Sequence, residues 1–440
     1  RPPRSTPKPS SAASDVYKRQ DLCPVGALTS KPYQFEARPW ELKKTETIDV
    51  MDAVGSNIRV DTYGWKVKRV LPRLNEDINE EWISDKTRYA CDGLLTQRLD
   101  EPYIRKDNKL SVVDWSEALA KVTSYLNEYK VDEIAFLSGD LCDLETLYLY
   151  KKLSDALSIK NVECRQEGCN IPFTHPSQYS FNTKIADIEK SDCILIVGSN
   201  VRQEAPIINA RIRKHKLATN VPIAVIGANL DLTFEYEHLG EDLNLLSDLI
   251  SNKNNFSKII EAAANPMIII GNSILNRKDS ISIFSVIEEL IHKYKFLQDD
   301  WNGFNVLQIA AARTGALNLG LYKQGSSLEK IYCAAEDDKI KLIISLGADE
   351  INFDRLKGAK VIYIGTHGDK GANKADIILP SAAYTEKDGI YINTEGRLQY
   401  AFKASFPPGN AKEDWKIINE LSNLLDLNWD IIDLSNVRSM

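Results

Sequence analysis

The sequence lacks the features that would place it in a membrane or on a nucleic acid. No apolar run approaches the length of a membrane span, because the longest runs, such as residues 193–197, are only as long as a strand. Acidic residues outnumber basic ones, 62 to 55, and the net charge of -7 argues against a general nucleic-acid surface. Any association with a membrane is therefore expected to go through partner proteins.

Known nucleotide-binding and catalytic signatures are also missing. The sequence has no G-x-G-x-x-G fingerprint, so dinucleotide binding of the Rossmann type has no support. It has no phosphate-binding G-x-x-x-x-G-K-[ST] loop, no H-E-x-x-H zinc motif and no G-x-S-x-G nucleophile motif. The sequence alone therefore assembles no obvious catalytic site.

The seven cysteines form no framework of disulfides. Their number is odd and they are scattered, which indicates a reducing compartment. The closest pair, Cys164 and Cys169, has no further ligands at metal-binding spacing, so we interpret both as buried free thiols. No C-x-x-C pair occurs in residues 24–440.

The stretch 23–28 holds the one cysteine with the surroundings of a cluster ligand. Cys23 is followed at once by a proline, as is the closing ligand of bacterial iron–sulfur runs. Such a ligand needs three partners, but no cysteine precedes it and the next, Cys91, is too far away. We therefore expect the sequence to begin just inside a cluster-binding domain. Residues 1–20 are basic, low in complexity and without apolar periodicity, and we interpret them as foreign to the fold.

Two kinds of pattern follow along the chain. Residues 45–100 are strand-rich, with the alternating segments 57–62 and 65–70 joined by a turn at Tyr63-Gly64. From about residue 110, helices alternate with short strands that are apolar on both faces, as is typical of parallel strands covered by helices. A helix is predicted to begin after Asp114, an N-cap with Glu117 three residues on.

This α/β pattern predicts doubly wound parallel sheets in two Rossmann-like halves. A strand-rich domain would precede them. The predicted strands are 134–138, 193–197, 223–226, 267–270, 342–346, 361–364 and 377–379, and the predicted helices include 205–217, 280–294 and 412–425.

Five of the predicted strands end in glycine followed by a small or polar residue. Loops at the carboxyl ends of parallel strands bind ligands in open α/β sheets, and glycine would let a phosphate or a pterin approach the backbone. Glycine also makes a tight strand-to-helix turn, which is the preferred interpretation of any single loop. A similar choice arises for His367 in loop 365–371, which is either a catalytic base or, as we favour, a hydrogen-bonded loop histidine. The five loops begin at Gly139, Gly198, Gly227, Gly271 and Gly347.

Several longer segments, taken together, are highly specific for one family of proteins. They are 23–33, 37–41, 48–58 and 76–88, followed by 209–214, 382–387, 393–397 and 413–418. Together they resemble the large iron–sulfur subunit of NADH:quinone oxidoreductase, respiratory complex I (the NuoG type). The resemblance covers roughly residues 21–425 and is closest to the mitochondrial and alphaproteobacterial branch.

The resemblance implies a division of the chain and a set of cofactors. Residues 21–44 would be the C-terminal tail of a ferredoxin-like 4Fe–4S domain, 45–100 a degenerate 4Fe–4S domain of the Mo/W bis-MGD type, and 101–440 a molybdopterin-oxidoreductase-like α/β domain. The complete subunit would hold 4Fe–4S and 2Fe–2S clusters, with Cys23 a ligand of one 4Fe–4S cluster. The other ligands match nothing here, so this N-terminally truncated chain is expected to hold no cluster and no molybdenum cofactor.

A departure from the related molybdenum enzymes concerns a second cluster. Those enzymes ligate it with a C-x-x-C-x-x-x-C run, and here Asp49, Asp52 and Ser56 stand at the matching positions. Carboxylates and hydroxyls are poor ligands for iron–sulfur clusters, which use thiolates. We therefore expect this cluster to be lost, and no cysteine or serine is a convincing molybdenum ligand.

The resemblance favours a non-catalytic scaffold subunit of NADH:quinone oxidoreductase, which relays electrons from NADH through iron–sulfur clusters to quinone. Its partners would be the flavin subunit and the quinone-proximal iron–sulfur subunits. It would lie on the cytoplasmic face of a bacterial inner membrane or the matrix face of a mitochondrial one. The alternative is an active molybdopterin-dependent oxidoreductase with bound molybdenum or tungsten. A Rossmann-like module for an unrelated nucleotide lacks the phosphate fingerprint.

Overall fold

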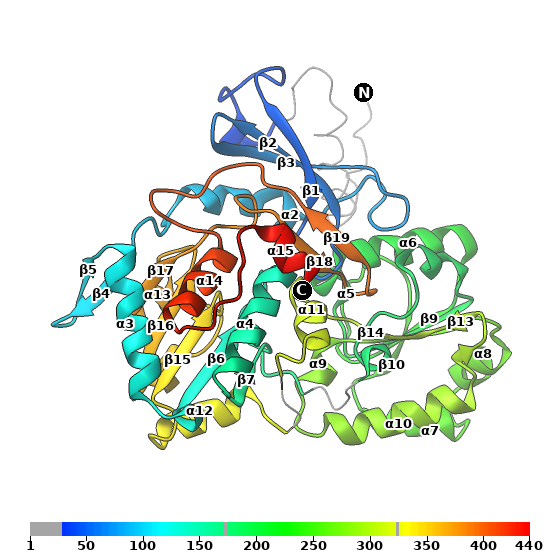
Figure 1. Ribbon diagram of the computed structural model, residues 1–440. Coiled ribbons are helices and arrows are strands. Elements are labelled where there is room, and N and C mark those ends of the chain that lie inside the picture. Colours follow the sequence, from blue (N-terminus) through cyan, green and yellow to red (C-terminus); the bar gives the residue numbers. More distant parts are fainter. Residues whose placement is uncertain (1–28, 171–174, 323–324) are drawn as a thin grey trace.

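The computed structural model describes residues 29–170, 175–322 and 325–440, which fold around two large sheets and a smaller antiparallel one (Figure 1). Residues 1–20 and Cys23 lie outside the described residues. None of the helices in the described part of the chain is long and apolar enough to cross a membrane.

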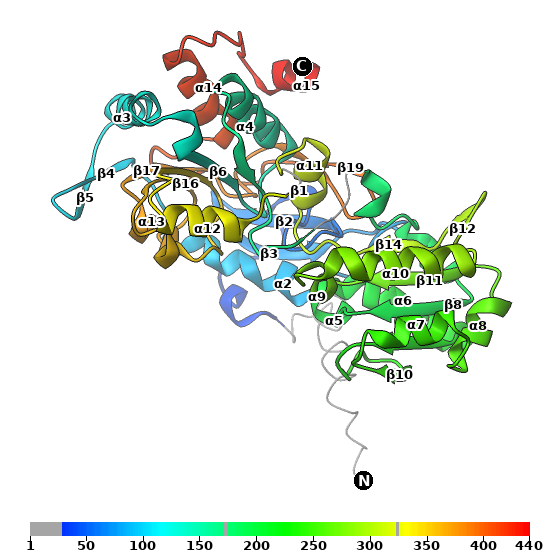
Figure 2. The ribbon, with the colours of Figure 1, turned by 90° about the horizontal axis from the view of Figure 1, so that it is seen from below.

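The first large sheet has the strand order β5-β4-β17-β16-β15-β6-β7. The strands from β17 to β7 are parallel, whereas β4 pairs antiparallel with β17 and with β5. Phe136 and Ile344 pack against α3, α4 and α14 on one face, and Leu137 and Ile343 pack against α12 and α13 on the other (Figure 2). The strands are β4 (Tyr103–Lys106), β5 (Lys109–Val112), β6 (Ile134–Ser138), β7 (Asn161–Glu163), β15 (Leu342–Leu346), β16 (Lys360–Gly365) and β17 (Ile377–Pro380).

The helices of this first unit begin with α3, which starts where the sequence predicts it. The Asp114 carboxylate accepts a hydrogen bond from the Glu117 amide at 2.8 Å and so caps the helix. The helices are α3 (Trp115–Glu128), α4 (Leu144–Ala156), α11 (Arg313–Asn318), α12 (Leu328–Glu336), α13 (Lys370–Lys374), α14 (Asp414–Leu424) and α15 (Leu434–Ser439).

The second large sheet is entirely parallel, in the order β10-β9-β8-β11-β14. Leu195 and Ile268 face α7, α8 and α10, while Ile196 and Ile269 face α6. The strands are β8 (Cys193–Val197), β9 (Ile223–Ile226), β10 (Glu237–Gly240), β11 (Pro266–Ile270) and β14 (Phe304–Val306). The helices are α5 (Val201–Glu204), α6 (Pro206–Thr219), α7 (Asn244–Ile250), α8 (Phe256–Ala262), α9 (Asn272–Leu275) and α10 (Ser280–Lys293).

The two large sheets confirm the predicted doubly wound α/β fold in two halves. This second unit is inserted between β7 and β15, so the first sheet is built from two distant parts of the chain. Both sheets reverse their winding at one point, between β6 and β15 in the first and between β8 and β11 in the second. The carboxyl ends of these strand pairs are where such folds bind ligands.

The small sheet pairs β1, β2 and β3 antiparallel and contains the predicted hairpin turn at Tyr63-Gly64. A hairpin from the far end of the chain joins it to the second unit: the Thr394 amide donates to the Ala53 carbonyl at 2.7 Å, and the Phe181 amide donates to the Thr394 carbonyl at 2.8 Å. The elements are β1 (Lys43–Ile48), β2 (Asn57–Tyr63), β3 (Lys66–Pro72), α2 (Asp85–Tyr89), β18 (Gly389–Ile392) and β19 (Leu398–Ala401).

Short elements complete the described chain. β12 (Leu297–Gln298) and β13 (Trp301–Asn302) form a minimal antiparallel pair. The 3-10 helices are Lys31–Tyr33, Ala90–Leu95, Val131–Glu133, Pro176–Gln178, Ile185–Lys190 and Phe353–Leu356.

Candidate functional site

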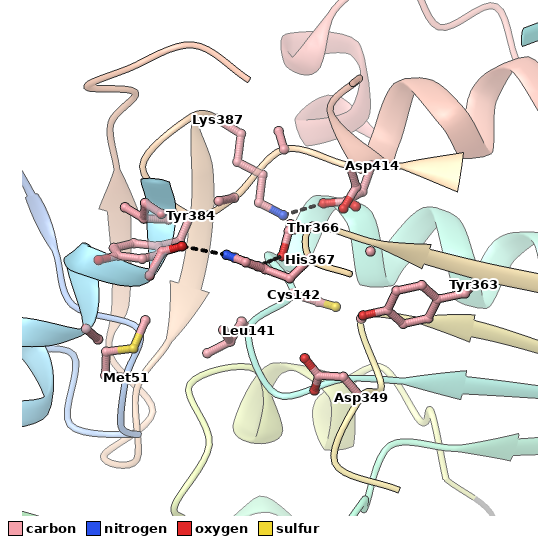
Figure 3. Close-up of a pocket in the computed structure, with 18 residues that line it drawn as sticks. Met51, Leu141, Cys142, Asp349, Tyr363, Thr366, His367, Tyr384, Lys387 and Asp414 are labelled. Carbon is pink, nitrogen blue, oxygen red and sulfur yellow. Dashed lines mark hydrogen bonds and ion pairs between the residues drawn. The ribbon is translucent and has the colours of Figure 1, made fainter. Parts of the chain in front are cut away.

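A cavity of about 170 Å³ lies beyond the carboxyl ends of the first sheet, where the sheet faces the small-sheet unit. The loops after β6, β15 and β16 form one side of it, and Met51 and the 3-10 helix at 90–95 form another (Figure 3). Segment 381–387 and Asp414 close it. Its position at the winding reversal of the sheet makes it the candidate ligand site of the fold.

A buried lysine lies between two carboxylates at one wall of this cavity. The Lys387 ammonium is 2.7 Å from Asp143 Oδ2 and also donates to Asp414 Oδ2. Burial favours the neutral amine, but the two carboxylates outweigh this effect and raise the pKa of Lys387. Asp143 in addition caps α4 by accepting from the Thr146 amide. The lysine charge is therefore neutralised within the protein and not offered to an anionic ligand.

The other polar groups of the cavity include an acid, a thiol and an imidazole. Burial, with a smaller contribution from Asp369, raises the pKa of Asp349 to about 6. Burial also raises the pKa of the Cys142 thiol, which is protonated at neutral pH. His367 is hydrogen-bonded through both ring nitrogens, to Thr366 Oγ1 at 2.8 Å and to the Gly93 carbonyl at 3.0 Å. The preferred interpretation as a hydrogen-bonded loop histidine is thereby confirmed.

The glycines at the strand ends serve close packing of one loop on the next. A Cβ atom on Gly139 would lie 1.9 Å from the Gly347 carbonyl oxygen, across the reversal of the first sheet. A Cβ atom on Gly271 would lie 2.4 Å from the Gly198 carbonyl oxygen, across the reversal of the second. Gly198 and Gly347 also have positive φ angles, of 62° and 61°. In these loops the turn interpretation is supported over the ligand interpretation.

The crevice of the second sheet is occupied by a side chain of the protein itself. The Glu204 carboxylate accepts hydrogen bonds from Ser199 Oγ at 2.9 Å, from the Asn200 amide at 3.0 Å and from the Asn272 amide at 3.3 Å. These donors come from the two loops that flank the reversal between β8 and β11. A ligand phosphate would need the same donors. The Glu204 carboxylate therefore already supplies the negative charge that a bound phosphate would bring to this crevice.

A second buried ion cluster lies beside the loop after β6. The fully buried Arg313 guanidinium donates to Glu167 Oε2 at 2.6 Å and to Asp140 Oδ1 at 3.2 Å. Cys164 and Cys169 are buried near this arginine, and burial raises the pKa of Cys164 to about 12. Both are protonated free thiols, as the sequence predicts. The described residues contain no group of three or more His, Cys, Asp and Glu side chains arranged to hold a metal.

Asp49, Asp52 and Ser56 are brought together in the loop between β1 and β2, and all three are fully buried. Asp49 accepts from Thr87 Oγ1 at 2.7 Å and from the Met51 amide at 3.1 Å. Burial and the neighbouring Asp52 carboxylate raise the pKa of Asp49 to about 7. Asp52 Oδ2 and Ser56 Oγ have no hydrogen-bond partner among the described residues.

This set of oxygen atoms does not fit an iron–sulfur cluster, which is held by thiolates. Residues 42–92 contain a single cysteine, Cys91, and burial raises the pKa of its thiol to about 11. The crevices of the two large sheets do not fit a molybdopterin cofactor either. That cofactor carries phosphate, whereas Asp140, Asp349 and Glu204 place carboxylates at the crevices. Two cations nearby, Lys387 and Arg313, are already paired with carboxylates of the protein.

The sequence points to Asp349 only through the loop that begins at Gly347 and to Lys387 only through segment 382–387, and it assigns no role to Glu204. Lys387 and Asp143 are brought together only by the tertiary fold, and no local pattern marks the pair. For Glu204, the signal available was its place shortly after the predicted strand 193–197 and the Gly198-Ser199-Asn200 loop.

Two family models match the chain. The molybdopterin oxidoreductase model matches residues 98–424, and the 4Fe–4S domain model of NADH-ubiquinone oxidoreductase NDSU1/NuoG-like proteins matches residues 42–92. The G-type subunit of NADH-quinone oxidoreductase from Rickettsia bellii is 45% identical over 419 residues, and the mitochondrial NADH-ubiquinone oxidoreductase 78 kDa subunit of Candida albicans is 47% identical over 424 residues. Both alignments cover 95% of this chain, but they cover 60% and 57% of those relatives.

A solved structure has the same fold at low sequence identity. Acetylene hydratase from Pelobacter acetylenicus aligns over 88% of this chain and 69% of its own, with a TM-score of 0.58 and 12% identity. This likeness concerns the fold alone, whereas the curated relatives share close to half of their aligned residues with the chain. The chain therefore belongs to the molybdopterin oxidoreductase family and is a homologue of the NuoG-type subunit of NADH-quinone oxidoreductase.

Proposed function

We propose that this chain is the scaffold portion of the large iron–sulfur subunit of NADH:quinone oxidoreductase, which passes electrons from NADH through iron–sulfur clusters to quinone. The observation that carries the proposal is the identity of 43–47% to the bacterial NuoG-type subunits and the mitochondrial 78 kDa subunits, sustained over 95% of the chain. The activity belongs to the whole assembly, and this polypeptide by itself has no reaction to catalyse.

Electrons would travel through the clusters and not through the large sheets. In the complete subunit Cys23 would be a ligand of one 4Fe–4S cluster, beside a further 4Fe–4S and a 2Fe–2S cluster. Asp49, Asp52 and Ser56 would stand where related enzymes hold another cluster. The proposed division into 1–20, 21–44, 45–100 and 101–440 follows from these roles.

The proposed partners are the flavin subunit and the quinone-proximal iron–sulfur subunits of the peripheral arm. The assembly would lie at the cytoplasmic face of a bacterial inner membrane or the matrix face of a mitochondrial one. The chain would seat the cluster-bearing region and offer surface to these partners.

The acidic crevices support a scaffold over a molybdenum enzyme. Glu204 occupies the amide donors that a cofactor phosphate would need, and Lys387 is neutralised by Asp143 and Asp414. The alternative, a molybdopterin-dependent oxidoreductase, rests on the match of the molybdopterin oxidoreductase model to residues 98–424.

An affinity tag inserted at Lys253, an exposed residue in the loop between α7 and α8, would test the proposal in the source organism. The purified complex should contain flavin and iron and should reduce quinone with NADH, without stoichiometric molybdenum or tungsten. Cys142→Ala and Cys169→Ala should keep this activity, since neither thiol would hold a metal. Recovery of the chain without flavin but with stoichiometric molybdenum would refute the scaffold role.

A further inference from the structure

The cavity at the end of the first sheet has a negative lining. Among the described residues that line it, the one ammonium group is that of Lys387, which the carboxylates of Asp143 and Asp414 share. The lysine and its two carboxylates together therefore add no positive charge. Asp349 adds a further carboxylate. A lining of this kind repels phosphates and carboxylates and attracts cations.

Asp349 has no counter-ion among the residues that the structure describes. Across the part of the chain that the structure describes, its side chain forms no ion pair or hydrogen bond with another residue. Figure 3 shows the carboxylate pointing into the cavity, beside Leu141 and the thiol of Cys142. Burial and Asp369 both disfavour its negative charge. A cation placed beside this carboxylate would remove that cost.

The rest of the cavity lining is largely apolar, so a ligand that fills the cavity must also offer apolar surface. Met51, Leu94, Leu141 and Ala382 contribute hydrocarbon surface, and Leu141 is 44% exposed. A cavity of about 170 Å³ is comparable to the roughly 150 Å³ apolar cavities that bind a benzene ring. A small inorganic ion would leave this apolar surface unfilled, whereas an organic body of about one ring would cover it.

We propose that this cavity binds a small organic cation, an apolar body of about one ring that carries a protonated amine or amidine, with Asp349 as its counter-ion. The charge of such a ligand is opposite to that of a phosphate-bearing cofactor. The site uses no cluster and no residue of another protein, so it stands apart from the proposed role in electron transfer. Binding to the isolated chain therefore tests it independently of the assembly.

Benzamidine is a suitable probe, and benzoate and benzyl alcohol are its anionic and neutral counterparts. Titration calorimetry and ligand-observed NMR with the purified chain should show saturable binding of benzamidine and none of benzoate. Asp349→Asn should weaken benzamidine binding about tenfold to a hundredfold, because a charge-assisted hydrogen bond is lost. Glu350→Gln, a change at the exposed neighbouring carboxylate, should leave the affinity unchanged.

A second variant separates loss of the site from loss of the fold. Leu141→Trp should fill the mouth of the cavity and abolish binding while the circular dichroism spectrum and melting temperature stay those of the wild type. The proposal is overturned by a failure of benzamidine to bind, by equal binding of benzoate, or by unchanged affinity in Asp349→Asn. It is also overturned if potassium chloride displaces benzamidine more effectively than choline chloride of the same ionic strength.

Discussion

Removing the buried ammonium of Lys387 should be among the most damaging single changes in this protein. Lys387 lies 2.7 Å from Asp143 Oδ2, and the same ammonium contacts Asp414. At this distance and an effective dielectric constant of about 20, one such attraction is about 6 kcal/mol before desolvation is subtracted. Loss of one partner from a buried pair typically costs about 3–5 kcal/mol, because the remaining charges stay buried. We expect that loss of unfolding free energy for Lys387→Met.

The pH dependence of this loss has a definite sign. Without the lysine, Asp143 and Asp414 face each other in a buried site, which raises their pKa values in the folded state above those in the unfolded chain. The stability that such groups contribute is complete below about pH 4 and is lost as the pH rises through the raised values. The deficit of Lys387→Met should therefore grow from pH 5 to pH 8. Adding Asp414→Asn should recover part of it.

Urea unfolding followed by tryptophan fluorescence measures these differences. With a slope of about 3 kcal/mol per molar urea, a loss of about 4 kcal/mol lowers the midpoint by about 1.3 M. Lys339→Met is the matched control: its ammonium is 2.8 Å from Asp337, but the two side chains are 71% and 60% exposed. That change should cost at most about 1 kcal/mol. Equal midpoints for the two variants would refute the reasoning.

Three further predictions follow from burial and packing. Asp49 has a folded-state pKa of about 7, so the stability that it contributes is lost as the pH rises from about 4 through 7. The melting temperature of Asp49→Asn should therefore exceed that of the wild type by a margin that grows from pH 5 to pH 8. A margin that stays constant over this range would contradict the prediction. Gly139→Ala should lower the free energy of unfolding by about 3 kcal/mol or more, because the new Cβ would clash with Gly347. Gly93→Ala is the control: the new atom meets open space, so the free energy of unfolding in the same urea assay should change by no more than about 0.5 kcal/mol. Iodoacetamide should label Cys333 of the native protein before the buried thiols, as peptide mapping would show, and labelling of a buried thiol first would refute their assigned burial.

The parts of the fold that the sequence predicts are those set by local or doubly buried patterns. Residues 193–197 form a strand with the predicted bounds, because such a strand is covered on both faces and reads as a continuous apolar run. The cap at Asp114 is predicted because it involves neighbours in the chain. β1 (Lys43–Ile48) is missed because its residues are mostly lysine, threonine and glutamate, and its pairing with β2 stabilises it.

The candidate site is harder to predict because distant segments supply it. Asp143 and Lys387 meet across 244 positions of sequence, a contact that no periodicity encodes. Asp49, Asp52 and Ser56 can be located from their spacing, but their complete burial depends on packing against residues such as Thr87. The strand-end glycines are visible in the sequence, and only the fold shows that Gly139 and Gly347 pack against each other.

The discontinuous first sheet has a consequence for how the protein is made. β6 pairs with β15, yet roughly 200 residues separate Ser138 from Leu342, and the whole second unit is encoded between them. At about 5–20 residues per second, a ribosome needs roughly 10–40 s to deliver the missing strand. During that time the nascent chain exposes the aliphatic edge of β6 that will later pair with β15, while the inserted second unit can already fold. Chaperone capture of the nascent chain should therefore be strongest in this interval and fall once Leu346 has left the exit tunnel.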